Sequence, residues 1–422
     1  MKLRALIAGL SAVALAFTAT ACGGDDGDNT KDVEVFTWWA DGSEKAGLDA
    51  LVAEFKKQHP DLNFVNGAVA GGAGSNAKNV LASRLQQQDP PSTFQAHAGA
   101  ELLDYIEANQ LQDVSQLYKE NGWDEVFPED LIELLTVDGK IYSVPSNVHR
   151  ANVVWANPEV LKKAGLDDKP AKDIDGFIQQ LDKLKKAGVD TPLSIATDWT
   201  QVHLLETVLI ADLGPEKYIG LWDGSTKWDS PEVSKAIDHY AKLLSYTNTD
   251  RQNLDWPDAT KMVIDGKAGF NIMGDWAEAA FQEADKEWGK DYITYPVPGT
   301  DGIFDFLADS FTLPVGAKNE EGTKAWLQTV GSAEGQKAFN MKKGSIPART
   351  DADPKDYGDY QKTALESYKN DTIVPSLAHG AAASVKWSTA ITEAVSSFSA
   401  NKDIEKLKSA LVKAAEDNQK KQ

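Results

Sequence analysis

Short extended runs and longer amphipathic runs alternate along the chain after residue 32. Residues 33–39 are rich in β-branched and aromatic side chains and largely alternate in polarity, which predicts a strand. Residues 48–58 place four apolar side chains on one face, which predicts a helix. A strand at 62–65, a helix at 76–88 and a strand at 93–96 follow. This β-α-β-α-β order predicts a parallel sheet with helices on its faces.

The same alternation continues through the rest of the chain. Further extended segments are predicted at 141–145, 268–273 and 309–314. Further helices are predicted at 177–187, 232–244, 261–265, 325–339 and 403–419. No internal repeat is present, so the pattern predicts an α/β protein rather than a repeat protein.

The first residues have the pattern of a targeting segment. Lys2 and Arg4 precede an uncharged apolar stretch, residues 6–17, which is too short to span a bilayer. The stretch leads into the sequence ATAC, which ends at Cys22, the only cysteine of the chain. This ending resembles a bacterial lipobox, in which the cysteine is diacylated. A plain secretory signal followed by a chance cysteine is the alternative.

We therefore predict a signal peptide at residues 1–21, and a lipidated cysteine with a flexible Gly/Asp-rich tether at 22–32. Two acyl chains are enough for stable anchoring. No later run is apolar and long enough to span a bilayer. The predicted location is the outer face of the cytoplasmic membrane, with the lipid as the only membrane contact.

Composition and charge restrict the class of protein and of partner. The chain has 422 residues, 42% hydrophobic and 25% charged, which predicts two or three folded domains of a globular protein. Its formal charge of −21 argues against nucleic acid or an anionic membrane surface as the main partner. Neutral or cationic small molecules remain. A single cysteine excludes an internal disulfide and a Cys-based zinc site.

Tryptophans at the ends of predicted elements are candidates for ligand binding. Trp38, Trp39, Trp256 and Trp276 lie there rather than inside apolar stripes. An indole stacks on the C–H face of a sugar ring, and Asp, Glu, Gln, Lys and His bind its hydroxyls. The alternative is that each tryptophan is a core residue. On a strand, Trp38 and Trp39 would point to opposite faces, so we expect that alternative to fail for one of them.

The histidines and nucleophiles do not form a catalytic pattern. Gln95 and His97 lie at the carboxyl end of a predicted strand, where α/β sheets bind their ligands. His97 and His379 can also be structural loop residues. No HExxH motif or GxSxG motif is present, so we expect no metal, no cofactor and no nucleophile-based enzyme. A glycosidase that uses two carboxylates stays open as an alternative, because Asp and Glu are plentiful.

Several segments together resemble an extracellular solute-binding lipoprotein of a carbohydrate ABC importer. The tryptophan pair is followed by the helix LDALVAEFKKQHPDL, and later by GKAGFNIMGDWA and LADSFTLPVGAKN. The combination of FQAHAG, MGDW, ADSF, KKGSIPAR and SLAHG is similar to the glucose/galactose-binding branch in particular. The resemblance covers essentially the whole mature chain.

The resemblance implies an α/β, two-lobed periplasmic-binding-protein-like fold, with the ligand cleft between lobes that crossover hinge segments join. Lobe 1 would comprise residues 33–144 and 309–350. Lobe 2 would comprise residues 145–308 and 351–422. Closure of the lobes around a sugar would then create the form that docks on a membrane permease.

The resemblance also implies a set of sugar-binding residues, transferred motif by motif. They are Trp38 or Trp39, Glu44, Gln95, His97, Trp256, Trp276, Asp309, Lys343 and His379. Asp41 competes with Glu44, because the turn before the first helix is one residue longer than the pattern of the branch. Trp256 or Trp276 would stack on the pyranose, and Asp309, Glu44 and Lys343 would bind hydroxyls. Gln95, His97 and His379 would complete the rim.

The expected function is therefore capture of a monosaccharide and its delivery to ABC permease subunits. Glucose is the expected ligand, with galactose and mannose as alternatives, and the protein is expected to be a monomer and not an enzyme. An oligosaccharide or a polyol in the same fold is a second possibility. A secreted glycosidase lipoprotein is a third, and an adhesion or scaffold lipoprotein a fourth.

Overall fold

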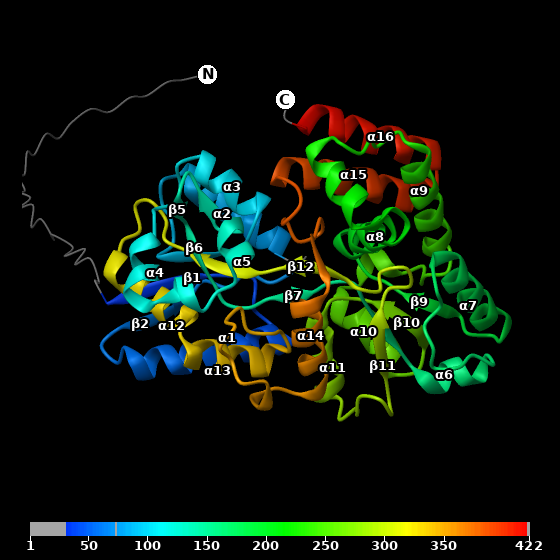
Figure 1. Cartoon of the computed structure of the whole chain (residues 1–422), viewed down its shortest axis with the longest axis horizontal. Coiled ribbons are helices and arrows are strands. Elements are labelled where there is room, and N and C mark those ends of the chain that lie inside the picture. The colour runs from blue at the N-terminus through cyan, green and yellow to red at the C-terminus, as the bar shows by residue number, and fades with distance from the viewer. Residues whose placement is uncertain (1–30, 72–73, 420–422) are drawn as a thin grey trace, which may run out of the picture.

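Two lobes lie side by side in the computed structural model, which describes residues 31–71 and 74–419 (Figure 1). The predicted signal peptide, Cys22 and most of the predicted tether lie outside the described residues. Among the described helices, none combines the length and the apolar character needed to cross a membrane. The arrangement confirms the predicted α/β, two-lobed fold class.

The first lobe is built on a five-stranded sheet with the order β2-β1-β3-β13-β6. Its strands are β1 (Asp32–Phe36), β2 (Asn63–Asn66), β3 (Thr93–His97), β6 (Ser143–Pro145) and β13 (Asp309–Thr312). β1 pairs in parallel with β2 and β3, which confirms the parallel sheet predicted from the N-terminal pattern. β13 returns from the second lobe and runs antiparallel to β3 and β6.

Helices cover this sheet, and their apolar faces form the first core. They are α1 (Gly42–Gln58), α2 (Ser75–Gln86), α3 (Ala100–Glu107), α4 (Ser115–Asn121), α5 (Glu129–Leu134), α12 (Glu320–Gly331) and α13 (Ala333–Lys343). A short hairpin of β4 (Thr136–Val137) and β5 (Lys140–Ile141) lies beside α5. Phe94 and Phe311 from the sheet pack with Phe55, Trp326 and Phe339 from the helices in this core.

The second lobe contains a four-stranded sheet with the order β11-β8-β10-β9. Its strands are β8 (Val153–Ala156), β9 (Thr191–Ser194), β10 (Ala268–Ile272) and β11 (Ile293–Pro296). Its helices are α6 (Pro158–Lys163), α7 (Ile174–Lys186), α8 (Asp198–Asp223), α9 (Pro231–Leu244), α10 (Trp256–Ile264), α11 (Glu278–Glu283), α15 (Val385–Asn401) and α16 (Ile404–Asn418). These elements enclose the other large apolar cores of the described chain.

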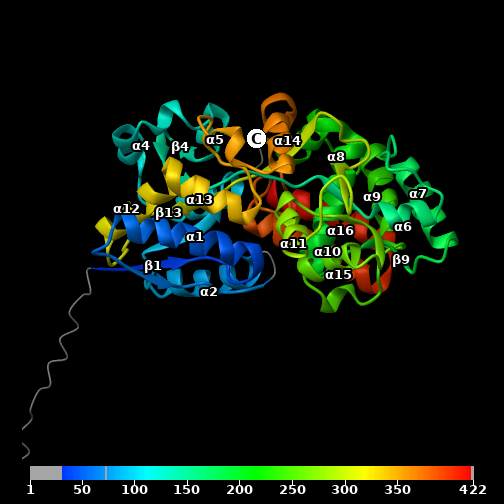
Figure 2. The same cartoon turned by 90° about the horizontal axis from the view of Figure 1, so that it is seen from below.

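A three-stranded sheet, which we call the junction sheet, lies between the lobes. It has the order β14-β12-β7 and consists of β7 (His149–Arg150), β12 (Ile303–Leu307) and β14 (Thr372–Pro375). Seen from below, α14 (Asp359–Asn370) and α5 lie next to each other over this junction (Figure 2). Short 3₁₀ turns complete the described structure: η2 (Trp123–Glu125), η3 (Arg251–Asn253), η4 (Asp275–Ala277) and η5 (Pro354–Asp356).

Two predictions of local structure are wrong. The first strand ends at Phe36, so Trp38 and Trp39 lie beyond it and strand alternation does not apply to them. Both are buried, at 7% and 0% exposure. The helix predicted at 325–339 is two helices, because the backbone of Ser332 is extended and its hydroxyl accepts a hydrogen bond from the N–H of Gly335 (2.9 Å), which caps α13.

α8 is the longest described helix that the sequence pattern did not predict. Its first half is buried on nearly every side, so it lacks the polar face that marks an amphipathic helix. Gly214 interrupts it with a φ of 73°, and Pro215 follows, which further conceals the helical pattern. This helix contributes Trp199 and His203 to the region between the lobes.

Candidate functional site

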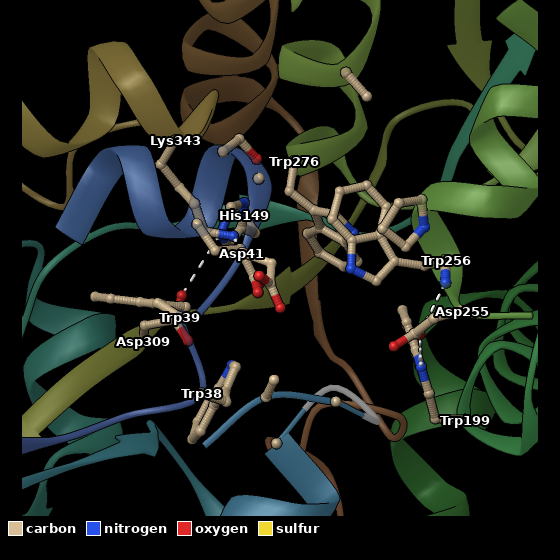
Figure 3. Close-up of a pocket in the computed structure, with 18 of the residues that line it drawn as sticks. Trp38, Trp39, Asp41, His149, Trp199, Asp255, Trp256, Trp276, Asp309 and Lys343 are labelled. Atoms are coloured by element: carbon tan, nitrogen blue, oxygen red, sulfur yellow. Dashed lines mark hydrogen bonds and ion pairs between the residues drawn. The ribbon is translucent and has the colours of Figure 1, made fainter. Parts of the chain in front are cut away.

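A cavity of about 490 Å³ lies between the two lobes, within the roughly 300–1,000 Å³ usual for small-molecule sites. Nine of the ten predicted site residues line it: Trp38, Trp39, Glu44, His97, Trp256, Trp276, Asp309, Lys343 and His379. Figure 3 shows Trp38, Trp39, Asp309 and Lys343 on one side, and Trp199, Trp256 and Trp276 on the other. The first group comes from the first lobe and the second group from the second lobe.

Gln95 is the predicted residue that does not line the cavity. It lies on β3 behind the wall, and its Nε2 donates to Asp309 Oδ1 at 2.7 Å. Its Oε1 accepts a hydrogen bond from the Thr37 hydroxyl. Gln95 therefore holds Asp309 from behind.

Asp309 is the central carboxylate of the first-lobe wall. The antiparallel register of β13 and β3 sets Asp309 opposite His97. Its Oδ2 accepts a hydrogen bond from Asn147 (2.9 Å), and Nε2 of His97 and Nε2 of His149 each lie 3.6 Å from one of its oxygens. Burial raises the pKa of Asp309, but His97, His149 and Lys343 outweigh burial and bring the pKa below its ordinary value. Asp309 is therefore an ionised acceptor, which binds hydroxyls more strongly than a neutral one.

Glu44 and Lys343 form the next part of the same wall. Lys343 ends α13 and Glu44 lies in the first turn of α1, and these two helices pack side by side. Lys343 Nζ lies 3.3 Å from Glu44 Oε1. Burial raises the pKa of Glu44, although Lys343 acts in the opposite direction. Asp41 also lines the cavity, but it is exposed and its side chain does not cap α1.

Trp276 forms the centre of the second-lobe wall. Its ring centroid lies 5.1 Å from that of His149 and 5.0 Å from that of His379. The indole folds back over Gly274, where an added Cβ would lie 2.0 Å from its Cζ3. Lys343 Nζ reaches across from the first lobe to 5.8 Å from the ring centroid, a cation–π distance. Gly274 is therefore needed for the position of this indole.

Two further tryptophans extend this wall. Trp256 begins α10 and is half-buried, and its backbone N–H donates to Oδ1 of Asp255 at 2.8 Å. Trp199, in the first turn of α8, donates from Nε1 to the same oxygen at 3.3 Å. Its ring centroid lies 6.4 Å from that of Trp276. Asp255 thus fixes one tryptophan through its backbone and another through its indole.

The tryptophan pair of the first lobe is tightly packed. Trp38 lies 5.0 Å from the ring of His97, and Gly74 closes over it with a φ of 90° and a Cβ position only 2.8 Å from the indole. Trp39 packs 5.4 Å from Phe311 and 4.5 Å from Phe339, measured between ring centroids. Both tryptophans are thus core residues on one side and cavity wall on the other.

Four buried polar atoms on cavity-lining residues have no hydrogen-bond partner among the described residues. They are Trp39 Nε1, Ser43 Oγ, His149 Nε2 and His379 Nε2. Buried polar groups are nearly always paired, because an unpaired one costs about 1–3 kcal/mol. A ligand with several hydroxyl groups in the cavity would supply the missing partners.

The contacts of His379 show whether its Nε2 donates or accepts a hydrogen bond. The Ser376 hydroxyl donates to Glu206 at 3.0 Å, so it accepts from Nδ1–H of His379 at 2.8 Å. Burial, reinforced by the neighbouring His203, lowers the pKa of His379 well below its ordinary value. The ring is therefore neutral, and its Nε2 is a hydrogen-bond acceptor at the cavity wall.

A cluster of three titratable side chains lies behind this wall. His203, Glu206 and Asp305 are buried, and one ligand atom from each lies within 4.8 Å of the others, which is a grouping that a metal ion could use. The carboxylates of Glu206 and Asp305, however, lie close together, and the neighbouring Glu206 helps to raise the pKa of Asp305. Burial raises the pKa of Glu206 to about 7 and the pKa of Asp305 well above its ordinary value. A shared proton accounts for this contact, and we assign no metal to it.

Sequence reasoning missed His149 and Trp199 as residues of the wall. His149 lies on a strand of two residues, which gives no pattern of its own. Trp199 belongs to the run of buried residues in α8 and has the pattern of a core residue. Only the packing of α8 against the junction brings Trp199 to the cavity.

Comparison with known proteins adds independent information. The family described as bacterial extracellular solute-binding protein matches residues 39–337. The chain is 34% identical over 388 residues to an uncharacterised ABC transporter extracellular-binding protein of Pyrococcus horikoshii, covering 91% of this chain and 87% of that one. It is 33% identical over 407 residues to a probable sugar-binding periplasmic protein of Mesorhizobium japonicum, covering 94% of each.

A solved structure shows the same fold. The bacterial solute receptor AcbH, described as having an exclusive preference for β-D-galactopyranose, superposes with a TM-score of 0.78. The two chains are 21% identical, and the match covers 92% of this chain and 97% of that one.

Proposed function

The chain belongs to the family of bacterial extracellular solute-binding proteins, and from this membership we propose that it is the sugar-binding component of an ABC transporter. It captures a monosaccharide outside the cell and delivers it to permease subunits in the membrane. The names of the relatives from Pyrococcus horikoshii and Mesorhizobium japonicum support the transporter and the sugar class. The family consists of binding proteins, so a glycosidase is not retained as the function.

The observation that carries the proposal is the composition of the two facing walls. The second lobe offers the indoles of Trp256 and Trp276, and the first lobe offers the charged groups of Asp309, Glu44 and Lys343. A pyranose has an apolar C–H face, which matches the indoles of the second lobe, and a rim of hydroxyls, which matches the charged groups of the first lobe. His97 and His379 complete the rim.

A ligand held in this way contacts both lobes at once. Contacts that exist only when the lobes are seated against each other stabilise the closed state over the open one. The closed form is the one that we expect to dock on the permease. We propose lipidation at Cys22 as the means that keeps the monomeric protein at the outer face of the membrane.

Glucose is the proposed ligand, with galactose and mannose as its nearest competitors. The test is a fluorescence titration of the chain that begins after Cys22, with D-glucose, D-galactose, D-mannose, maltose and sorbitol as ligands. Saturable quenching or enhancement by a hexose supports the monosaccharide assignment. A response to maltose or sorbitol alone replaces it with an oligosaccharide or a polyol. Release of nitrophenol from an aryl glucoside would contradict a binding role.

A further inference from the structure

The carboxylate of Asp275 is fully buried just beyond β10 of the second lobe, and it does not line the cavity. One of its oxygens is hydrogen-bonded to Nδ1 of His149. The other accepts the backbone N–H of Arg150 at 3.0 Å. Both partners belong to β7 of the junction sheet, so Asp275 ties the second lobe to this sheet through two hydrogen bonds.

His149 continues this connection to the first lobe. With Nδ1 bound to Asp275, its Nε2 faces Oδ2 of Asp309 at 3.6 Å. Asp309 lies on β13 of the first-lobe sheet. The order Asp275, His149, Asp309 therefore crosses from the second-lobe sheet through the junction sheet to the first-lobe sheet. Trp276, the residue after Asp275, contacts the edge of the same imidazole.

We propose that Asp275 is a positioning residue that holds His149 against Asp309 and thereby links the position of the second lobe to the sugar-binding carboxylate. This inference rests on the proposed function only in its effect on sugar affinity. The effect on the position of the lobes holds whatever the ligand is. The buried pair of Asp275 and His149 then fixes the positions of Trp276 and Asp309, which we expect to contact the sugar.

The first lobe contains a second carboxylate–histidine pair beside Asp309, but the hydrogen bonds of this pair do not connect the two lobes. Glu101 Oε2 lies 2.8 Å from Nδ1 of His97, and Nε2 of His97 lies 3.6 Å from Oδ1 of Asp309. Burial opposes the ionisation of Glu101, but Lys78 and His97 outweigh burial and lower its pKa to about 2. Glu101 thus positions His97 as Asp275 positions His149. The hydrogen-bond partners of its carboxylate among the described residues are His97 and Lys78, which both belong to the first lobe, and Gly380 packs beside it without such a bond to the carboxylate.

This symmetry supplies a matched control. Removal of either carboxylate frees one imidazole beside Asp309, so both changes should weaken sugar binding. Only removal of Asp275 also breaks side-chain hydrogen bonds that connect the second lobe to the junction sheet. A difference between the two variants in the distance between the lobes therefore isolates the linkage from the loss of a well-placed histidine.

The experiment uses the chain that begins after Cys22, which has no cysteine of its own. Lys56→Cys in α1 and Lys186→Cys in α7 place one label on an exposed position of each lobe. Single-molecule energy transfer then gives the distribution of interlobe distances without sugar and with D-glucose. Asp275→Ala, Asp275→Asn and Glu101→Ala are compared in this background, and urea unfolding confirms that each variant is folded.

We expect Asp275→Ala to broaden the interlobe distribution without sugar and to weaken D-glucose binding by roughly 10-fold or more, within the 5–150-fold range of coupling between sites. Asp275→Asn should lie between it and the wild type, because Asn retains an acceptor for His149 but none for Arg150. Glu101→Ala should weaken D-glucose binding and leave the distribution unchanged.

Two results would overturn the inference. One is an unchanged interlobe distribution in folded Asp275→Ala. The other is an equal broadening in Glu101→Ala, which would show that any loosened histidine has this effect. If the wild type binds none of the sugars, the proposed function fails, and the distributions measured without sugar still decide the inference.

Discussion

Lys343 Nζ lies 3.3 Å from Glu44 Oε1, although 299 positions separate the two residues in the chain. The packing of α1 against α13 creates this pair at the edge of the cavity. Lys343 is 2% exposed, so its charge is held by a partner and not by water. A pair of this kind keeps a cation at a fixed place beside a ligand. Removal of Lys343 leaves the carboxylate of Glu44, which is 20% exposed, without its counter-charge.

Lys343→Met should therefore affect both binding and the charge of its partner. We expect D-glucose affinity to fall at least 10-fold, because a charged hydrogen bond contributes about 1.5–3 kcal/mol. The pKa of Glu44 should rise further, since Lys343 is the main group that lowers it. Calorimetric titration measures the affinity. Lys45→Met in α1, which removes an exposed pair with Asp49, is the matched control and should leave binding unchanged.

Asp309 should support binding over a wide pH range. Its folded pKa lies below the ordinary value of 3.8, so it is ionised at every pH above that value. Its contribution to stability and binding should be present above pH 4 and be lost as the pH falls through its folded pKa. Between pH 7 and pH 4.5, D-glucose affinity should depend on pH in the same way in the wild type and in Asp309→Asn. A decline at low pH that the wild type shows and Asp309→Asn does not would mean that Asp309 is protonated in that range.

The buried pair Glu206 and Asp305 should make stability depend on pH in the opposite direction. The pKa of Glu206 is about 7 in the folded chain against 4.5 ordinarily, so the folded state keeps a proton that the unfolded state releases. The contribution of the pair is fully present below pH 4.5 and is lost as the pH rises through 7. The loss should be a few kcal/mol, because each tenfold difference in proton affinity between the folded and unfolded states corresponds to about 1.4 kcal/mol.

Urea unfolding at pH 5 to 8 tests this expectation as a difference between wild type and Glu206→Gln. The difference is needed because His203 and His379, whose pKa values are lowered by burial, titrate with the opposite sign. We expect wild type to lose more free energy of unfolding than Glu206→Gln between pH 5 and pH 8. Parallel curves for the two proteins would show that the pair does not hold a proton.

Gly274 offers a test of the aromatic wall that leaves every indole in the chain. A Cβ in Gly274→Ala would meet the ring of Trp276 at 2.0 Å, so the ring must move. We expect a changed tryptophan emission and at least 10-fold weaker D-glucose binding. Gly358→Ala, where the Cβ meets its nearest atom at an ordinary 3.6 Å, should change neither. Wild-type affinity in Gly274→Ala would mean that the position of Trp276 is not important for the ligand.

Anchoring can be tested at Cys22. In cells, the wild-type chain should fractionate with membranes, and Cys22→Ala should appear in the soluble or secreted fraction. Mass spectrometry of the mature N-terminus should show a diacylated cysteine. An unmodified cysteine would support a plain secretory signal instead.

Much of the site could be predicted because short motifs carry it. MGDW, ADSF and SLAHG each place one polar or aromatic residue beside a strand end or loop, and the structure brings these residues to one cavity. What the sequence could not show is how distant segments meet. Asp309 faces His97 because β13 inserts beside β3 in an antiparallel register, and that pairing follows from the whole fold.

The missed residues have a common physical cause. His149 lies on a strand of two residues, and Trp199 begins a helix that is buried on most sides, so neither has a periodic pattern around it. The positions of Trp38 and Trp39 were misjudged because the strand ends at Phe36. In each case, tertiary packing and not local preference decides where the side chain points.

The central claim is that the cavity around Asp309 binds a hexose, and calorimetric titration of D-glucose tests it most directly. The chain that begins after Cys22 should give a saturable, one-to-one isotherm, and Asp309→Asn should bind at least 10-fold more weakly, because it loses the charge of the central acceptor. An absence of heat with D-glucose, D-galactose and D-mannose, or equal affinity in the wild type and in folded Asp309→Asn, would contradict the account.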